Sequence, residues 1–314
     1  MRVQVAAFYR FVPLASEELP LWRTRILELG RATGLLGTIL LATEGINGTV
    51  AGSDASVAAL LELLRADPRL ADLEVKRSEA TGAVFHRFKV RLKAEIVTMA
   101  EPSAQPARGT GVPVPPEHWN ALLDDPGTLA IDTRNHYEVA LGSFAGAIDP
   151  GTEHFRDFPA WVEQHLRPLV AQRRPQRLAL FCTGGIRCEK ATAHLLNQGF
   201  EQVLQLQGGI LNYLEQVTEA ESRWRGECYV FDQRVALDHR LQPGTYHVCH
   251  ACGLPLAPAD LALASYVEGV SCRHCIDRYA AADRERFAER QRQMRRAEAS
   301  GEAHIGRPMP PVAG

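Results

Sequence analysis

The chain has 314 residues, of which 46% are hydrophobic, and its 35 basic and 37 acidic side chains leave a formal net charge of −2. This length allows two or three domains of about 100–150 residues each. The near-neutral charge excludes a generally basic nucleic-acid-binding protein, so a nucleic acid would have to be bound by a local basic patch.

The chain contains neither an apolar run of the ~20 residues that span a membrane nor a signal-peptide core near its start. Its seven cysteines are an odd number, and four of them form two Cys-x2-Cys pairs. This pattern fits a reducing compartment better than a framework of disulfides. We therefore expect a cytoplasmic protein that does not bind membranes, and the sequence predicts no protein partner.

Residues 1–100 predict a small α+β domain, because β-forming runs alternate with segments of helical periodicity. The expected order βαββαβ is that of a ferredoxin-like, acylphosphatase-like domain. The expected elements are strands at 3–12 and 37–41, helices at 19–34 and at 54–64 with Ser53 or Asp54 as cap, a third strand after Asn47-Gly48, and last strands at 73–77 and 88–96.

The glycines that follow the second predicted strand allow two interpretations. Gly45 and Gly48 can form a cradle for a phosphate group, whereas Asn47-Gly48 is a strong two-residue hairpin turn. The hairpin explains the same residues with fewer assumptions, so we expect a turn at Asn47-Gly48.

Basic side chains gather on and before the last strand of this domain. Alternation along a strand places Arg87, Lys89, Arg91 and Lys93 on one face and apolar residues on the other. Such a strip is most often a solvated face, but it is also what the phosphate backbone of a nucleic acid requires. These four residues are therefore the candidates for contact with a nucleic acid.

Residues 101–116 contain five prolines and predict an extended linker. A second domain, predicted at residues 117–218, begins with a helix at 117–123 and a buried strand at 129–132. Asp132 and Arg134 come at the end of that strand, and charged groups at the carboxyl end of a parallel strand usually face the ligand crevice. We expect Asp132 to support the crevice through hydrogen bonds rather than to perform chemistry.

Cys182 lies where a predicted strand at 177–181 ends and a helix follows. The next residues are Thr183, Gly184, Gly185 and Ile186, and the two glycines let several backbone N–H groups point inward. Together with a helix N-terminus and Arg187, this environment can lower the pKa of a thiol from ~8.5 into the range of roughly 3.5–7.5. We therefore interpret Cys182 as a nucleophile rather than an inert buried cysteine.

Cys188 comes one residue after Arg187, in the first turn of the predicted helix. It can act as a resolving thiol for Cys182, or it can fill a position that requires a small side chain. We favour the second interpretation.

The C-terminal part, residues 219–285, contains two Cys-x2-Cys pairs separated by nineteen residues. This spacing is typical of a structural zinc site in which each pair supplies two ligands, although two redox dithiols are an alternative. The ligands would be Cys249, Cys252, Cys272 and Cys275. Residues 286–314 predict the rest of a long charged helix, followed by a disordered tail.

Chemistry at Cys182 admits three classes of function. A persulfide carried on Cys182 suits sulfur transfer, and a cysteine-arginine loop also suits a phosphatase. Cysteine phosphatases, however, need Cys-x5-Arg to surround a phosphate, and only four residues separate Cys182 from Arg187. The third class is a non-enzymatic adaptor that uses the same fold without turnover.

Several stretches of the second predicted domain resemble a rhodanese domain. They are Thr128–Arg134, Tyr137-Glu138, Gly142–Ile148, the Cys-x4-Arg loop and Val203–Ile210. One departure is Ser143, where that family more often has histidine. The resemblance implies an α/β domain with a parallel sheet.

Taken as a whole, the chain resembles the bacterial tRNA uridine(34) hydroxylase family. The resemblance rests on Thr43–Thr49, on Cys182–Lys190 and on the two cysteine pairs. It implies oxygen-dependent 5-hydroxylation of the wobble uridine in the anticodon region of tRNA, an oxidoreductase reaction of class EC 1.14, with Cys182 and Arg187 at the site. Molecular oxygen would be the co-substrate, and the sequence shows no flavin or nicotinamide site. The alternative is a thiosulfate or persulfide sulfurtransferase in a sulfur relay.

Overall fold

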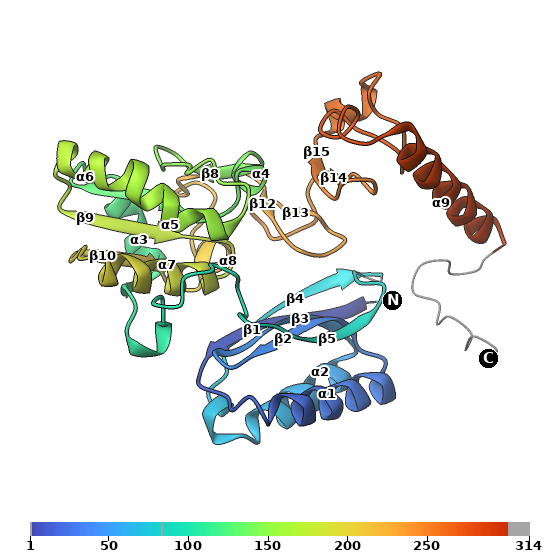
Figure 1. Cartoon of the computed structure of the whole chain (residues 1–314), viewed down its shortest axis with the longest axis horizontal. Helices are drawn as coiled ribbons and strands as arrows, with labels where there is room; N and C mark the ends of the chain where they lie inside the picture. The colour runs from blue at the N-terminus through green and yellow to red at the C-terminus, as the bar shows by residue number, and fades with distance from the viewer. Residues whose placement is uncertain (1, 83, 301–314) are drawn as a thin grey trace. The chain divides into compact units, whose positions relative to one another are not determined.

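The computed structural model describes residues 2–82 and 84–300. The chain divides into two compact units (Figure 1). One contains the chain up to Val230 together with Ala236–Pro243, and the other contains Phe231–Val235 and the chain from Gly244 onward. Within the described residues, no helix combines the length and the apolar character needed to cross a bilayer.

A five-stranded sheet with two helices on one face forms the N-terminal domain (Figure 1). The strand order is β4-β1-β3-β2-β5, and every neighbouring pair is antiparallel except β2 with β5. The predicted order βαββαβ is confirmed, and the further strand predicted at 88–96 is present as the edge strand β5, which ends at Leu92. The elements are β1 (Arg2–Phe11), α1 (Leu19–Thr33), β2 (Leu36–Ala42), β3 (Gly45–Gly52), α2 (Asp54–Arg65), β4 (Val75–Thr81) and β5 (Phe88–Leu92).

The predicted turn at Asn47-Gly48 is wrong. Thr43 and Glu44 connect β2 to β3, and Asn47 and Gly48 lie inside β3, paired with residues of both β1 and β2. Gly48 is required for packing, because a Cβ atom there would approach the ring of Phe8 to 2.8 Å. The other expected feature of this region is confirmed, since the Ser53 hydroxyl caps α2 by accepting a hydrogen bond from the Ser56 N–H at 3.1 Å.

Residues 101–116 are more than an extended spacer. Ala104 is buried in the core of the second domain, and β6 (Val112–Val114) pairs in parallel with β10 (Val203–Leu206). The second half of the proline-rich segment is therefore an edge strand of the next sheet. Proline is tolerated at this edge because an edge strand leaves one row of N–H groups unpaired.

The second domain is a four-stranded parallel sheet in the order β6-β10-β9-β7. Residues of α5 and α7 pack on one face, and residues of α3 and α8 pack on the other. Both faces are covered because successive side chains along a strand point to opposite faces of the sheet. In β7, Leu129 and Ile131 point to the first face and Ala130 points to the second. The elements are α3 (Pro116–Leu123), β7 (Thr128–Asp132), α4 (His136–Val139), β8 (Gly142–Phe144), α5 (Phe158–Trp161), α6 (Arg167–Arg173), β9 (Arg177–Phe181), α7 (Ile186–Asn197) and α8 (Gly209–Gln216).

The segment after α8 is shared between the two units. β11 (Trp224–Gly226) pairs with β8, and β12 (Cys228–Tyr229) pairs with β13 (Ala236–Leu237), all within the first unit. The second unit contains β14 (His247–Val248), β15 (Pro255–Leu256) and α9 (Ala281–Ala299). The predicted charged helix is therefore present, and the tail predicted to be disordered lies outside the described residues from 301 onward.

Candidate functional site

Cys182 lies at the end of β9, and the residues up to Gly185 form a tight loop, here called the Cys182 loop (residues 182–185), before α7 begins at Ile186. The Gly185 N–H donates a hydrogen bond to Cys182 Sγ at 3.1 Å. Gly185 has φ = +105°, a conformation that favours glycine. The predicted strand-loop-helix arrangement is confirmed, and Cys182 is only 1% exposed.

The surroundings of Cys182 stabilise its thiolate. Burial by itself would raise the pKa of the thiol, but the Cys188 thiol, the charge of Arg187 and the N–H groups of Cys188 and Gly185 lower the pKa to about 5. Burial and the neighbouring thiolate raise the pKa of Cys188 well above its usual value. At neutral pH, Cys182 is therefore a thiolate and Cys188 is a neutral thiol that donates to it.

Arg187 is oriented by a carboxylate. Its two terminal nitrogens donate to the two oxygens of Glu138 at 2.6 and 2.8 Å, and Nη2 also lies 3.4 Å from the Thr183 hydroxyl. Arg187 and Glu138 are both buried, so the pair is shielded from water. Sequence reasoning missed Glu138; its one clue was the Tyr137-Glu138 pair in the rhodanese resemblance.

Asp132 and Arg134 form a fully buried ion pair behind the loop rather than lining an open crevice. The Arg134 side chain donates to both oxygens of Asp132, at 2.9 and 2.6 Å, and also to the Gly142 carbonyl. The Ser143 hydroxyl donates to Asp132 at 2.8 Å. Asp132 therefore makes the hydrogen bonds that were expected of a supporting residue, and the departure at Ser143 contributes one of them.

Two residues of the N-terminal domain contact the Cys182 loop and its neighbours. Tyr9 of β1 donates a hydrogen bond to Glu189 of α7 at 2.7 Å. The Lys76 ammonium of β4 donates to the Gly184 carbonyl at 2.8 Å and also to the Gly208 carbonyl. Neither contact could be predicted from the sequence, because the partners are far apart along the chain; Lys76 and Gly184 are 108 positions apart.

A second contact joins the same two domains. The Lys190 ammonium on α7 donates to Glu44 at 3.0 and 2.8 Å, to the Val97 carbonyl at 3.0 Å, and to Glu95. Burial acts to raise the pKa of Glu95, but Lys190 and two backbone N–H groups outweigh it and lower that pKa. Glu44, from the conspicuous Thr43–Thr49 stretch, thus anchors α7.

The basic strip is exposed on the sheet face opposite the helices of its domain. Lys89 and Arg91 are exposed, whereas Phe88 and Val90 pack into the core. Arg87 and Lys93 flank β5 and are also exposed. One row of paired residues runs across all five strands on this face, through Lys89, Thr38, Thr49, Ala7 and Lys76. The strip therefore shares a face with a residue that contacts the Cys182 loop.

The four cysteines of the two Cys-x2-Cys pairs come together in the second unit. Their sulfur atoms all lie within 4.8 Å of one another, and three neighbouring pairs are separated by 3.7 to 4.0 Å. Tetrahedral Zn–S bonds of about 2.3 Å place sulfur atoms about 3.8 Å apart. The residues therefore fit a four-coordinate zinc ion, with Cys249, Cys252, Cys272 and Cys275 filling every ligand position.

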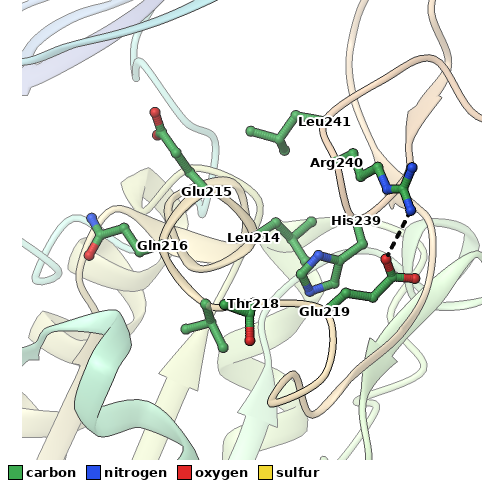
Figure 2. A pocket seen from close by; sticks show the side chains of 9 residues that line it. Leu214, Glu215, Gln216, Thr218, Glu219, His239, Arg240 and Leu241 are labelled. Atoms are coloured by element: carbon green, nitrogen blue, oxygen red, sulfur yellow. Dashed lines mark ion pairs between the residues drawn. The ribbon is translucent and has the colours of Figure 1, made fainter.

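A surface pocket of about 450 Å³ lies at the end of α8 (Figure 2). Its lining includes Leu214, Thr218 and His239, and Arg240 pairs with Glu219 at its edge at 3.7 Å. None of its lining residues belongs to the Cys182 loop. This pocket is therefore separate from the thiol chemistry.

Comparison with known proteins gives two family matches and several close relatives. Residues 3–96 match the UPF0176 acylphosphatase like domain, and residues 115–216 match the Rhodanese-like domain. A protein named tRNA uridine(34) hydroxylase from Parasynechococcus marenigrum (strain WH8102) is 56% identical over 298 residues, which cover 93% of each chain. Proteins of the same name from Prochlorococcus marinus are 55% identical (strain MIT 9313) and 46% identical (strain NATL2A), each over 93% of this chain and over 94% and 92% of the relative.

Proposed function

Because the chain belongs to the tRNA uridine(34) hydroxylase family, we propose that it converts the wobble uridine of tRNA to 5-hydroxyuridine in an oxygen-dependent reaction. The observation that carries this proposal is the geometry at Cys182 Sγ, which accepts a hydrogen bond from the Gly185 N–H at 3.1 Å at the start of α7. The Cys188 thiol and the charge of Arg187, followed by backbone N–H groups, lower the pKa of this thiol to about 5. The protein is then an oxidoreductase (EC 1.14) that acts in the cytoplasm, together with its tRNA substrate.

The thiolate has a defined task in this reaction. Cys182 Sγ adds to C6 of the uracil ring, and the electron pair of the C5–C6 double bond moves toward C5 and the C4 carbonyl. C5 then attacks one oxygen of hydrogen peroxide, which dioxygen forms with two electrons and two protons from an external reductant. The O–O bond breaks, C5 gains a hydroxyl group, and the other oxygen leaves as hydroxide, which becomes water when it takes up the C5 proton. Loss of the C5 proton and cleavage of the S–C6 bond restore the ring and release the thiolate.

Access to the sulfur requires movement, because Cys182 is almost completely buried. Gly184 is the half-buried member of the loop, and a side chain added there would meet no atom within 4 Å. Open space therefore lies beside Gly184. We propose that the uracil enters past Gly184 and displaces the loop as it approaches the sulfur.

The exposed basic strip supports contact with the tRNA backbone. Arg87, Lys89, Arg91 and Lys93 present one sign of charge on the sheet face from which Lys76 reaches the Cys182 loop. The strip on β5 and Lys76 on β4 lie at the two edges of this face. A phosphate backbone that crosses the face from the strip would bring the anticodon to the thiolate.

The proposed zinc ion has a structural role. Four cysteine ligands leave no open coordination position, so the ion supplies folding energy to the second unit and no catalytic water. The chemistry therefore remains at Cys182.

Mass spectrometry of tRNA nucleosides tests this function. In a strain that lacks the gene, 5-hydroxyuridine should disappear from tRNA; the native gene should restore it, and Cys182→Ser should not.

The alternative function is that of a sulfurtransferase. It is supported by the amide loop around Sγ, because the same N–H groups can also stabilise a persulfide. Loss of a thiolated base with normal 5-hydroxyuridine would support that alternative. If neither nucleoside changes, the protein is a non-enzymatic adaptor.

A further inference from the structure

The peptide unit between Gly184 and Gly185 is held from both sides. Its carbonyl oxygen accepts a hydrogen bond from Lys76 Nζ at 2.8 Å, and its N–H donates to Cys182 Sγ at 3.1 Å. Both groups belong to one planar unit, so fixing the direction of the carbonyl also fixes the direction of the N–H. Lys76 thereby acts on the sulfur without touching it.

This peptide unit needs an anchor because glycine stands on both of its sides. Glycine adopts positive and negative φ values with similar ease, so the 184–185 peptide can rotate at small cost. Rotation would turn a carbonyl oxygen toward the thiolate in place of an N–H donor, which would raise the pKa of Cys182. The bond from Lys76 opposes that rotation and also polarises the peptide, which strengthens the N–H as a donor.

Lys76 is well suited to this role. An ammonium group has three donors, and Lys76 uses them on two carbonyls, Gly184 of the Cys182 loop and Gly208 before α8. Burial lowers the pKa of Lys76 to about 8, against the opposing effect of the negative charges on Cys182 and Glu74. The side chain is thus largely charged at neutral pH.

The N-terminal domain supports the same peptide through Tyr9. A Cβ atom on Gly185 would come within 2.7 Å of the Tyr9 hydroxyl, so Tyr9 packs directly over Gly185. The Tyr9 hydroxyl is fixed in turn by Glu189. Two strands of a different domain therefore define the conformation of the loop that carries the reacting sulfur.

We propose that Lys76 is a positioning residue for Cys182: through the 184–185 peptide it keeps the Gly185 N–H directed at the sulfur, so that docking of the N-terminal domain maintains the thiolate. The relevance of this role to catalysis rests on the proposed function. The effect on the thiol does not, and it can be measured without tRNA.

The test uses the full-length protein and the variant Lys76→Met, which keeps the length of the side chain and removes its charge and donors. Alkylation of Cys182 by iodoacetamide, followed by peptide mass spectrometry across pH, gives the pKa of this one thiol. The midpoint should rise by about one unit, a tenfold loss of thiolate in the acidic range. Arg77→Met is the matched control, since Arg77 is the exposed neighbour on β4 and its removal should leave the midpoint unchanged.

A second measurement separates the anchored peptide from a simple effect of charge. At pH 7, with Cys182 ionised in both proteins, the Gly185 amide proton should move upfield in Lys76→Met because its hydrogen bond to sulfur weakens. Lys76→Arg, which keeps a charge and donors, should retain most of the native shift and midpoint.

A folded Lys76→Met protein with an unchanged midpoint and an unchanged Gly185 resonance would overturn the proposal. If Lys76→Met does not fold, the same two readouts on Lys76→Leu, which also lacks a donor, decide, with a higher midpoint and an upfield shift expected. Absence of hydroxylase activity in the native protein would instead refute the proposed function, and the measured midpoints would remain valid.

Discussion

Glu138 and Arg187 form a buried two-point ion pair beside the thiolate, with nitrogen–oxygen distances of 2.6 and 2.8 Å. The pair explains how an arginine is held where its charge lowers the pKa of Cys182. Glu138 fixes the guanidinium in place, and the charge of Arg187 acts on the sulfur through space.

Removing one partner of this pair should destabilise the protein. Glu138→Gln leaves the buried Arg187 without its carboxylate, and the loss of one partner of a buried pair typically costs about 3–5 kcal/mol. Urea unfolding should show a loss of this order. The control is Glu163→Gln, because the Glu163–Arg167 pair is exposed and its loss should cost less than about 1 kcal/mol. Equal losses in the two variants would contradict the structural role of Glu138.

The Cys188 thiol should lower the pKa of Cys182 by donating a hydrogen bond to it. Cys188→Ala removes that donor, so the alkylation midpoint of Cys182 should move to higher pH. Cys228→Ala is the control, since Cys228 is also buried but its pKa is raised to about 12 and it remains a neutral thiol. A midpoint that stays in place after Cys188→Ala would show that Cys188 only fills space.

Charge reversal on the basic strip should weaken tRNA binding. Replacing Lys89 and Arg91 with Glu removes two phosphate contacts, so affinity should fall and the slope of log affinity against log salt should become shallower by about 2. Arg25→Glu serves as the control, because Arg25 is exposed on α1, which covers the opposite face of the sheet. If the variant with Glu at positions 89 and 91 binds tRNA as well as the native protein does, the strip is only a solvated surface.

Removal of zinc should affect the second unit and spare the thiolate. The purified protein should contain about one zinc per chain, and Cys272→Ser should lose it, as measured by atomic emission. Chelation should lower the melting temperature of the second unit, while the alkylation midpoint of Cys182 stays the same. A protein that contains no metal and forms disulfides between the pairs would favour redox dithiols instead.

Local features of the site could be predicted from the sequence, and features that depend on domain packing could not. The strand, the glycine loop and the helix around Cys182 lie within about twenty consecutive residues, and each Cys-x2-Cys pair is also a local pattern. Glu138, Tyr9 and Lys76 reach the site from distant segments, so their roles follow only from the packing of separate elements. The misplaced turn has a similar cause, since Gly48 is required by contact with Phe8.

The proposed chemistry depends on the ionisation of Cys182, and the direction of its pKa shift determines how reactivity changes with pH. Its folded-state pKa, about 5, is lower than that of an ordinary thiol. Below pH 5 the sulfur is protonated and unreactive, and reactivity should rise through pH 5 and stay constant from about pH 6.5 upward. The lowered pKa also stabilises the folded state. This stabilisation is complete at pH values above the pKa of the unfolded thiol, and it is lost as the pH falls toward 5.

The most direct measurement is the rate of alkylation of Cys182 in the native protein as a function of pH, resolved by peptide mass spectrometry. The predicted result is a single midpoint near pH 5. A midpoint near pH ~8.5, the pKa of an ordinary thiol, would show that Cys182 is not a thiolate at neutral pH. That result would also contradict the proposed attack on uridine.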